Sequence, residues 1–380
     1  MLSKNKIVIM TSSHAALDVR IFHKQAHSLA EAGYNITVIG QHDKNEVING
    51  VRILSLPTPK TRFYRMFRFP IKILFNTLKE KAKIYHFHDP ELIPIGLILK
   101  LFTRAKIIYD IHEDYQGSIL AKIWIPSFLR SFVSKIYFLA ERVCFYIFDK
   151  IIVAGDDIAS NFPISFKVAL VRNYPLLDKI KLTDRKRKSQ EKTIVLIYTG
   201  TLERERGIKE AIEAVDSLQG KARLILLGWF YDPQFESEIK DRVNDNIQLV
   251  GKVPFDKVPY FMEKADVGII CLLPSPNNIA AASRNNKLFE YMSAGLPVIS
   301  SNFPSWRNIV EGNNCGLTVD PMNPEEIAKA IEYLLEQPEL MEEMGRNGQN
   351  AVLEKYNWEQ ESIKLLDVYA NILNPKSNAV

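Results

Sequence analysis

The chain has 380 residues, of which 47% are hydrophobic and 24% are charged, with a formal net charge of +5. This is the balance of a globular protein, and the length is more than one ordinary core supports, so we expect two domains. The mild positive charge suits an acidic substrate or an anionic membrane surface but does not require nucleic acid. No uncharged apolar run is long enough to span a bilayer, so no membrane-spanning helix is expected.

The ends and the cysteines indicate the expected compartment. Residues 1–6 lead directly into an apolar strand, so we expect no export signal. Cys144, Cys271 and Cys315 are scattered within apolar runs, which favours buried thiols in a reducing environment. We therefore expect a cytoplasmic protein, with the inner face of the cytoplasmic membrane as a possible place of work.

Strands alternate with helices along the chain, a pattern typical of parallel α/β domains. In the first half a long amphipathic helix is predicted over 20–33, and strands are predicted at 6–12, 35–40, 51–56, 84–88, 106–111, 150–154 and 168–172. In the second half strands are predicted at 193–199, 222–227, 246–250, 266–272, 297–300 and 316–319. The interpretation is a Rossmann-like domain over 1–175, a polar, basic linker over 176–192 and a second such domain over 193–357. A final segment, 358–380, contains a helix around 358–373 that could pack on either domain.

Several common ligand-binding motifs are missing. The first strand is not followed by G-x-G-x-x-G, and the chain contains neither a P-loop sequence nor a G-x-S-x-G elbow. A dinucleotide clamp, a P-loop nucleotide site and an α/β-hydrolase nucleophile are therefore unsupported.

All seven histidines lie within the first 112 residues. His86 and His88 share one face at the end of a predicted strand, but no cysteine or His–Glu spacing accompanies them, so we expect no metal. His112 follows the next buried strand, at the sheet edge where α/β proteins place ligands. For His88 and His112 both a ligand-facing role and a structural role at a strand end remain open.

The second half contains two candidate anion-binding segments. In "IYTGTLERERGIKEAI" (197–212) a strand leads through Gly200 to a charged loop with Arg204 and Arg206, and then to a helix start. In "ASRNNKLFEYMSAGLPVIS" (282–300) an asparagine-capped helix carries Lys287 and Glu290 on one face. Free amides and cations suit a diphosphate, and a carboxylate suits a vicinal diol such as ribose. Solvated charged pairs are the alternative for both segments.

These segments, together with "HDPELIPIG", "YDIHEDY" and "SSHAALDVRIFHKQAHSLAEAGYNITVI", resemble the family-4 glycosyltransferases, in particular a subgroup with a K-L-F-E-Y-M helix. The tail pattern "CGLTVDPMNPEEIAKAI" followed by "KYNW" is similar as well, so the resemblance covers about residues 6 to 370. It implies the GT-B fold, in which two Rossmann-like domains face each other across a cleft.

The resemblance also assigns roles to positions. It implies catalytic roles for His112 beside the donor sugar, Arg206 on the diphosphate and Glu290 on the ribose. The remaining nucleotide-sugar contacts are expected from Ala16, Gly200, Thr201, Arg204, Gly251, Lys252, Val253, Asn286, Lys287 and Leu288. The acceptor side is expected from His14, Asp18, Arg20 and His88.

Three positions depart from the family pattern. Ala282 replaces the first glutamate of a paired-glutamate motif, Thr201 replaces an arginine for which Arg204 would substitute, and Ala15-Ala16 replaces a Gly-Gly pair. The departures affect the expected contacts to the donor sugar and to the phosphates.

The implied reaction moves a sugar from a nucleotide diphosphate donor to an acceptor hydroxyl, with retention at the anomeric carbon and without metal or cofactor. Helix amides and Arg206 would absorb the charge of the leaving diphosphate. Domain closure about 173–192 would exclude water.

The acceptor is suggested only by surface composition. Residues 116–150 carry an apolar stripe of Trp124, Phe128, Phe132, Ile136 and Leu139, flanked by Lys122, Arg130, Lys135 and Arg142. With the basic, aromatic segment 60–72, this stripe is consistent with contact to an anionic membrane, and a core helix with a cationic rim is the alternative. A glycan or lipid-linked acceptor in polysaccharide or lipopolysaccharide assembly follows as a hypothesis.

Other functions remain as alternatives. One is a GT-B-like sugar-nucleotide epimerase or a phosphorylase, and another is a non-catalytic binder of nucleotide sugars. Nucleic acid is not an expected partner. A non-catalytic nucleic-acid binder stays among the alternatives, and it would show salt-sensitive affinity for nucleic acid and no turnover of sugar nucleotides.

Overall fold

The structure is a computed structural model that describes residues 5–121, 125–163, 165–177, 193–254 and 257–374. The contacts divide the chain into two units. Unit 1 comprises Met1–Asn173 and Trp358–Val380, and unit 2 comprises Tyr174–Asn357. Most of the predicted linker, 176–192, lies outside the described residues.

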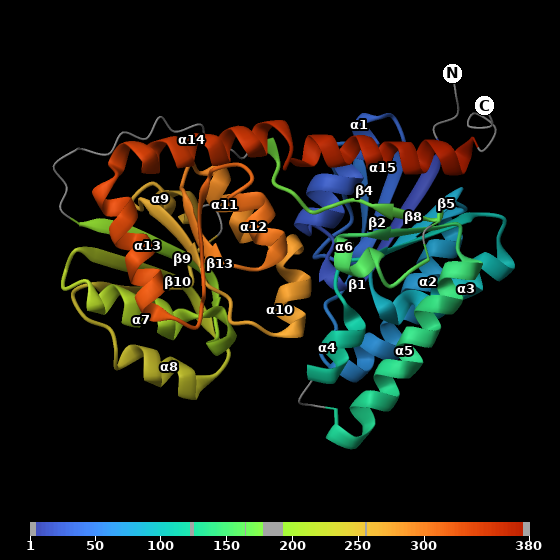
Figure 1. The fold of residues 1–380 in the computed structure, drawn as a ribbon. Helices are drawn as coiled ribbons and strands as arrows, with labels where there is room; N and C mark the ends of the chain where they lie inside the picture. The colour runs from blue at the N-terminus through green and yellow to red at the C-terminus, as the bar shows by residue number, and fades with distance from the viewer. Residues whose placement is uncertain (1–4, 122–124, 164, 178–192, 255–256, 375–380) are drawn as a thin grey trace. The chain divides into compact units, whose positions relative to one another are not determined.

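Unit 1 is built on an eight-stranded sheet in the order β3-β4-β2-β1-β5-β6-β7-β8 (Figure 1). All neighbouring pairs are parallel except β3 and β4. The seven strands predicted for this half are present, and β3 is an additional edge strand. The strands are β1 (Lys6–Ala15), β2 (Asn35–Gln41), β3 (Glu46–Ile48), β4 (Val51–Leu56), β5 (Ile84–Phe87), β6 (Lys106–Ile111), β7 (Lys150–Val153) and β8 (Val168–Leu170).

Helices cover both faces of this sheet. Right-handed crossovers place α2, α3 and α5 on one face, with α3 packed between the other two, and η1 with α1 on the opposite face. The helical elements are η1 (Val19–Ala26), α1 (His27–Glu31), η2 (Tyr64–Arg68), α2 (Phe69–Glu80), η3 (Pro90–Leu92), α3 (Ile93–Phe102), α4 (Tyr115–Ala121), α5 (Ser127–Ile147), α6 (Asp156–Ala159) and α15 (Trp358–Leu373).

The helix predicted over 20–33 differs in form from the prediction. Its first part, η1, is π-helical, and only His27–Glu31 is α-helical. The carbonyl oxygen of Asp18 accepts from the amides of both Phe22 (2.8 Å) and His23 (3.4 Å), which widens the first turn. The side chain of Asp18 caps this turn by accepting from the amides of Arg20 and Ile21.

The C-terminal helix α15 returns to unit 1 and packs against η1 and α1 (Figure 1). Polar bonds fix it there: the Trp358 indole donates to Ser28 Oγ at 2.9 Å, and Glu361 accepts from the Arg172 amide at 2.8 Å. The sequence left the choice of domain open, and the structure resolves it in favour of unit 1.

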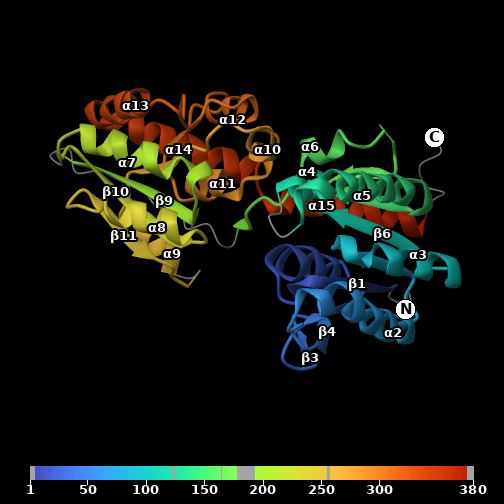
Figure 2. The ribbon, with the colours of Figure 1, turned by 90° about the horizontal axis from the view of Figure 1, so that it is seen from below.

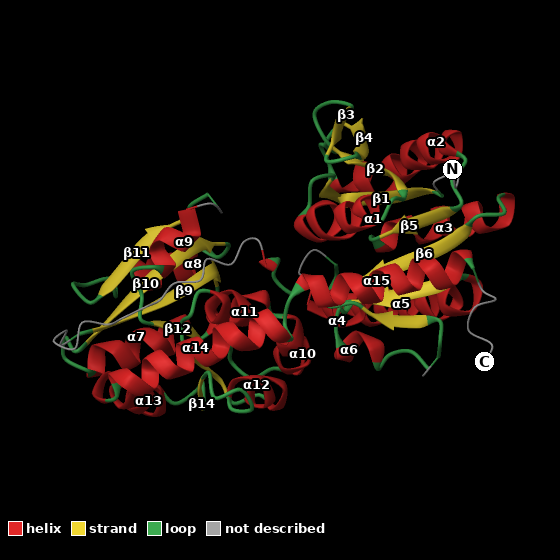
Figure 3. Cartoon of the chain, turned by 90° about the horizontal axis from the view of Figure 1, so that it is seen from above, coloured by secondary structure: helices red, strands yellow, loops and turns green. Residues whose placement is uncertain are grey.

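Unit 2 contains a six-stranded parallel sheet in the order β11-β10-β9-β12-β13-β14, again with helices on both faces (Figures 2 and 3). All six predicted strands are present: β9 (Ile194–Leu202), β10 (Ala222–Phe230), β11 (Ile247–Gly251), β12 (Val267–Ile270), β13 (Val298–Ser301) and β14 (Gly316–Val319). The helical elements are η5 (Arg204–Arg206), α7 (Ile208–Ser217), α8 (Pro233–Lys240), α9 (Val258–Met262), α10 (Pro276–Ala281), η7 (Ala282–Arg284), α11 (Asn286–Ser293), α12 (Pro304–Val310), α13 (Pro324–Glu336) and α14 (Pro338–Glu354).

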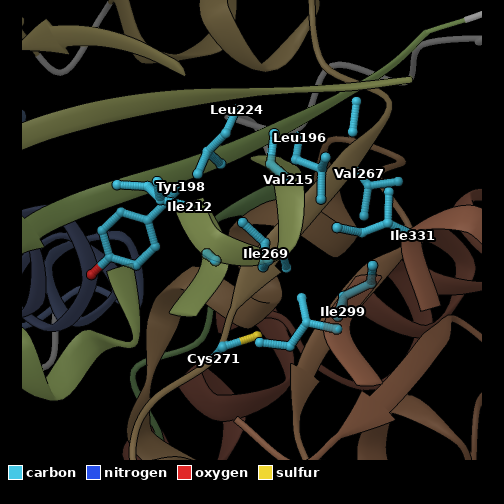
Figure 4. Close-up of a cluster of buried hydrophobic side chains, with 14 of the residues drawn as sticks. Leu196, Tyr198, Ile212, Val215, Leu224, Val267, Ile269, Cys271, Ile299 and Ile331 are labelled. Carbon is cyan, nitrogen blue, oxygen red and sulfur yellow. The ribbon is translucent and has the colours of Figure 1, made fainter. Parts of the chain in front are cut away.

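A hydrophobic core holds unit 2 together. Leu196, Leu224 and Ile269 of the sheet pack against Ile212 of α7 and Ile331 of α13, and all five are buried (Figure 4). Cys271 belongs to this core, and Cys144 and Cys315 are also buried free thiols, as predicted. Across the described part of the chain, the helices are too short or too polar to cross a bilayer.

Candidate active site

In unit 1 three of the predicted histidines meet at the carboxyl edge of the sheet. His88 follows β5 and His112 follows β6, and the two rings are joined by a 2.7 Å hydrogen bond between Nδ1 of His88 and Nε2 of His112. The ring of His14, at the end of β1, lies 5.7 Å from that of His112. His88 is fully buried, whereas His112 is 14% exposed at its side chain. The structure therefore places His112 at the surface of the group and His88 behind it.

Asp110 is the charged centre of this group and was not predicted. Its carboxylate is fully buried and accepts from Arg20 Nη2 at 3.0 and 3.1 Å and from Gln25 Nε2 at 2.5 Å. Arg20 also donates to the carbonyl oxygen of Val171 at 3.0 Å. Arg20 is buried and engaged in these bonds, and Asp18 caps η1. Both residues, which were acceptor-side candidates, therefore make structural contacts within unit 1.

The environment keeps Asp110 charged and the histidines neutral. Burial pushes the pKa of Asp110 upward, but the neighbouring groups, led by the charge of Arg20, outweigh it and hold that pKa well below its usual value. Burial lowers the pKa of His112 to about 4 against the opposing pull of Asp110. Burial, reinforced by His86, lowers the pKa of His88 well below its usual value. Near neutral pH His88 and His112 are therefore uncharged hydrogen-bonding groups.

A second unpredicted aspartate, Asp89, holds the loop after β1. Its Oδ2 accepts from Thr11 Oγ1 and the Ser12 amide, both at 2.7 Å, and from the Ser13 amide at 3.1 Å. Its Oδ1 lies 3.3 Å from Nδ1 of His14. The available sequence signal was its position directly after the strand-end histidine in "HDPE". Asp89 thus positions His14.

Ala16 was expected to bring its backbone to a phosphate. Its side chain is buried and its amide donates to the carbonyl oxygen of Gln41 at 2.8 Å. The amide of Ala16 is therefore used within the unit.

His86, Asp110 and His88 offer ligand atoms within 4.8 Å of one another, so these three residues could hold a metal ion. The carboxylate of Asp110 is already bound by Arg20 and Gln25, and Nδ1 of His86 is bound to Tyr369 Oη at 2.6 Å. With the bond between Nδ1 of His88 and His112, each of the three members already has a protein partner.

In unit 2 Lys287 lies directly on Gly200. Gly200 has a φ of +124°, and a methyl group there would overlap Cε of Lys287 and come within 2.7 Å of its Nζ. Burial lowers the pKa of Lys287; the negative charge of Glu290 opposes this shift and the positive charge of Arg206 adds to it. The side-chain stem of Lys287 needs a residue without Cβ at position 200, which explains the glycine.

The helix α11 begins as predicted. Asn285 caps it by accepting from the Lys287 amide at 3.2 Å, while Leu288 is buried below. The Tyr291 hydroxyl accepts from the Thr199 amide at 2.8 Å and so fixes α11 to β9. The amides of the first turn, which include that of Asn286, have no partner within the helix itself, and Glu290 lies one turn further on. The helix start thus offers positive potential beside Lys287.

The two arginines of the 203–207 turn separate. Arg206 lies beside Glu203, with Nε at 3.4 Å from Oε2, and remains 28% exposed at its side chain. Arg204 instead pairs with Glu238 of α8 at 2.6 Å and stacks 4.8 Å from the ring centroid of Phe235. Arg204 is thus held by α8, whereas the positive charge of Arg206 contributes to lowering the pKa of Lys287.

Ala282 is fully buried, and its carbonyl oxygen accepts from the indole of Trp306 at 2.7 Å. A glutamate at this position would place an unpaired carboxylate in the core. The packing of η7 on α12 therefore favours a small apolar side chain at position 282, where the family pattern has a glutamate.

An aromatic group lies at the ends of β10 and β11. Trp229 is 37% exposed and Tyr231 is 70% exposed, and the Lys252 ammonium lies 5.2 Å from the Trp229 ring centroid. Gly251 ends β11 with a φ of +85°, and Thr201 pairs in register with Trp229. The sequence predicted a role for residues 251–253, of which Val253 is half-buried. It did not predict Trp229, whose only signal was its position two residues after the predicted strand 222–227.

Comparisons with known proteins find similar sequences and folds. The model for "Glycosyl transferases group 1" matches residues 179–351, and the model for "Glycosyltransferase Family 4" matches residues 19–163. A Bacillus subtilis protein named as a glycosyltransferase, YtcC, is 24% identical over 367 residues, which span 90% of this chain and 85% of its own.

Solved structures show the same fold. HepE of Anabaena, determined in complex with UDP-glucose, has a TM-score of 0.70 at 13% identity and covers 96% of this chain and 99% of its own. WaaG, a glycosyltransferase involved in lipopolysaccharide biosynthesis, has a TM-score of 0.67 at 16% identity and covers 95% of this chain and 99% of its own. The predicted GT-B fold is confirmed.

Proposed function

We propose that this chain, which has the GT-B fold and whose two halves match models of glycosyltransferase families, is a family-4-like glycosyltransferase. It transfers a hexosyl group with retention from a nucleoside diphosphate sugar to an acceptor hydroxyl. The observation that carries the proposal is the packing of Lys287 on Gly200 beside Arg206, at the capped start of α11. This arrangement gathers two cations and free amides where a diphosphate needs them. We also infer that the chain belongs to the subgroup with a K-L-F-E-Y-M helix.

The chemistry depends on the leaving group. The bond from the anomeric carbon to the β-phosphate oxygen breaks, and the acceptor oxygen bonds to that carbon on the same face. The acceptor proton passes to the departing phosphate oxygen. Arg206, Lys287 and the α11 amides stabilise the developing negative charge, so no metal or cofactor is required. In this proposal Glu290 accepts from the ribose hydroxyls, while Trp229 and Lys252 border the base.

Unit 1 contributes neutral hydrogen-bonding groups. His112 contacts the transferred sugar, His88 orients it through their 2.7 Å bond, and His14 lies on the acceptor side. A neutral imidazole suits a sugar hydroxyl, since a cation there would compete for the leaving diphosphate.

For the acceptor we propose a glycan or lipid-linked saccharide in polysaccharide or lipopolysaccharide assembly, met at the cytoplasmic face of the membrane. The involvement of WaaG in lipopolysaccharide biosynthesis supports the acceptor class.

The test is a panel of sugar nucleotides offered to the purified chain, with thermal shift and release of nucleoside diphosphate as readouts. We expect one donor to raise the melting temperature and to be turned over slowly even without acceptor. Interconversion of the sugar without nucleotide release would indicate an epimerase instead. Binding without any turnover in the presence of membrane extracts would indicate a non-catalytic binder.

A further inference from the structure

The helix α5 has an unusual polarity in unit 1. Its outward face is apolar: Phe128 is 79% exposed, Phe132 62% and Leu139 63%, and Ile136, Val143 and Tyr146 continue the face. Its buried residues include the polar side chains Ser134 and Glu141. An amphipathic helix of a water-exposed unit normally has the opposite arrangement.

Polar bonds fix this orientation of α5. Tyr137 Oη donates to Glu141 at 2.6 Å and lies 2.9 Å from Tyr109 Oη of β6. Ser134 Oγ donates to the carbonyl oxygen of Gln116 at 3.1 Å. Turning the apolar face inward would break these bonds, so the exposure of the phenylalanines is a property of the fold.

The neighbouring helices extend the apolar surface. Phe63, Phe67 and Phe75 of the η2–α2 segment are 68%, 58% and 61% exposed. Leu101 and Phe102, at the end of α3 between α2 and α5, are also exposed. Arg65 ties η2 to the candidate active site, because it binds Ser13 Oγ and lies 3.2 Å from Glu91.

Charge on this surface is of one sign. Residues 60–83 contain eight lysines and arginines and one acidic residue, Glu80. Glu80 is buried and paired with Lys6 and Arg52. In α5 the cations are Arg130, Lys135 and Arg142, and its one acidic residue is the buried Glu141.

We infer that the outer surface of α2, α3 and α5 is a docking face for an anionic lipid bilayer. The exposed phenylalanines enter the acyl boundary, and the surrounding lysines and arginines contact lipid phosphates. A nucleic-acid partner fits less well, because the large exposed side chains of α2, α3 and α5 include many phenylalanine, leucine and isoleucine side chains. Docking through η2 would bring the membrane surface next to His14, which gives the proposed lipid-linked acceptor of the preceding section a short path.

The test is sedimentation of the purified full chain with vesicles of phosphatidylcholine alone or with 30 mol% phosphatidylglycerol (about the anionic content of a strongly charged membrane). We expect binding only to the anionic vesicles and a fall of the bound fraction with added salt. The double variant Phe128→Ser/Phe132→Ser should bind at least tenfold more weakly. Its matched control is Ile363→Ser, an aliphatic residue of α15 that is 55% exposed.

A second pair of variants tests the charges. Arg68→Glu/Lys72→Glu should also reduce binding about tenfold, while Lys329→Glu on the exposed surface of unit 2 should not. Equal binding to both vesicle types, unchanged binding of the face variants, or their selective loss of affinity for single-stranded nucleic acid instead of vesicles would overturn the proposal. Turnover of a soluble donor without acceptor, measured in the same variants, tests the proposed function separately, since that reaction needs no membrane.

Discussion

Units 1 and 2 share an architecture, but the side chains at their candidate sites differ in charge and burial. Unit 1 gathers histidines and aspartates at one sheet edge, and the lowered pKa values of His88 and His112 keep these two rings neutral. Unit 2 instead has Lys287 packed on Gly200 and the partly exposed Arg206, together with the start of α11. The difference teaches that one sheet edge can present either neutral hydrogen-bonding groups or positive charge, depending on which side chains the strands bury.

The largest expected effect tests whether the unit 1 site depends on its buried charge. Asp110→Ala should lower the free energy of unfolding by about 3–5 kcal/mol, because Arg20 would remain buried without its partner. Chemical denaturation measures this. The control is Asp156→Ala, which removes the exposed pair with Arg172 and should cost below about 1 kcal/mol. Similar losses in both variants would contradict the assigned role of Asp110.

The next effect separates the two sites by function. Arg206→Ala should weaken binding of the bare nucleoside diphosphate by about 1.5–3 kcal/mol, the value of a hydrogen bond to a charged group. His112→Ala should cut turnover sharply and leave that binding nearly unchanged. Calorimetric titration with the diphosphate and with the intact donor measures both. Equal loss of diphosphate affinity in the two variants would refute the placement of His112 beside the sugar.

A third test concerns the backbone of unit 2. Gly200→Ala should cost about 1–3 kcal/mol of stability through its positive φ and should also displace Lys287 and weaken diphosphate binding. Gly220→Ala is the matched control, because its φ is +87° but a methyl group there meets nothing within 4 Å. If the two variants bind the diphosphate equally well, Lys287 does not depend on Gly200.

The fourth effect is confined to the ribose. Glu290→Ala should weaken the nucleotide by about 1–3 kcal/mol, because the diol or its partners would lose their hydrogen bonds. The deoxyribose form of the same nucleotide should be nearly insensitive to the change. Unchanged affinity for the ribose form, in a variant shown to be folded by circular dichroism, would remove Glu290 from the site.

The smallest effect is an expected absence of change. Activity should persist in excess chelator, since Arg206, Lys287 and helix amides supply the positive charge. Loss of turnover that a divalent ion restores would instead direct attention to His86, His88 and Asp110. Unit 1 would then also contribute positive charge, which we assign to unit 2 alone.

Local sequence patterns predicted the sheets and parts of both sites. Apolar runs located the strands, and the position of His88 and His112 at strand ends predicted that each lies at the carboxyl edge of the sheet. The strand β3 was missed although the Asn49-Gly50 pair, with φ values of 49° and 77°, is a standard hairpin signal. The asparagine cap of α11 followed from the same kind of local chemistry.

Partners distant in sequence were not predictable. From the sequence, Asp110 looked like an ordinary residue of a buried strand. Its role was not visible because its partner, Arg20, lies 90 positions away. The bond between His86 and Tyr369 joins residues 283 positions apart. Arg204 appeared equivalent to Arg206 until Glu238 and Phe235 were seen to engage it. Such pairings depend on the tertiary fold, and periodicity carries no information about them.

The return of α15 to unit 1 has a consequence for synthesis. Unit 1 receives its last helix only after unit 2 has been translated in full, so a nascent chain can complete unit 2 while unit 1 still lacks the hydroxyl of Tyr369 beside His86. A premature stop before Trp358 would therefore damage the half of the protein that was made first. The correct folding of unit 1 therefore depends on the synthesis of α15.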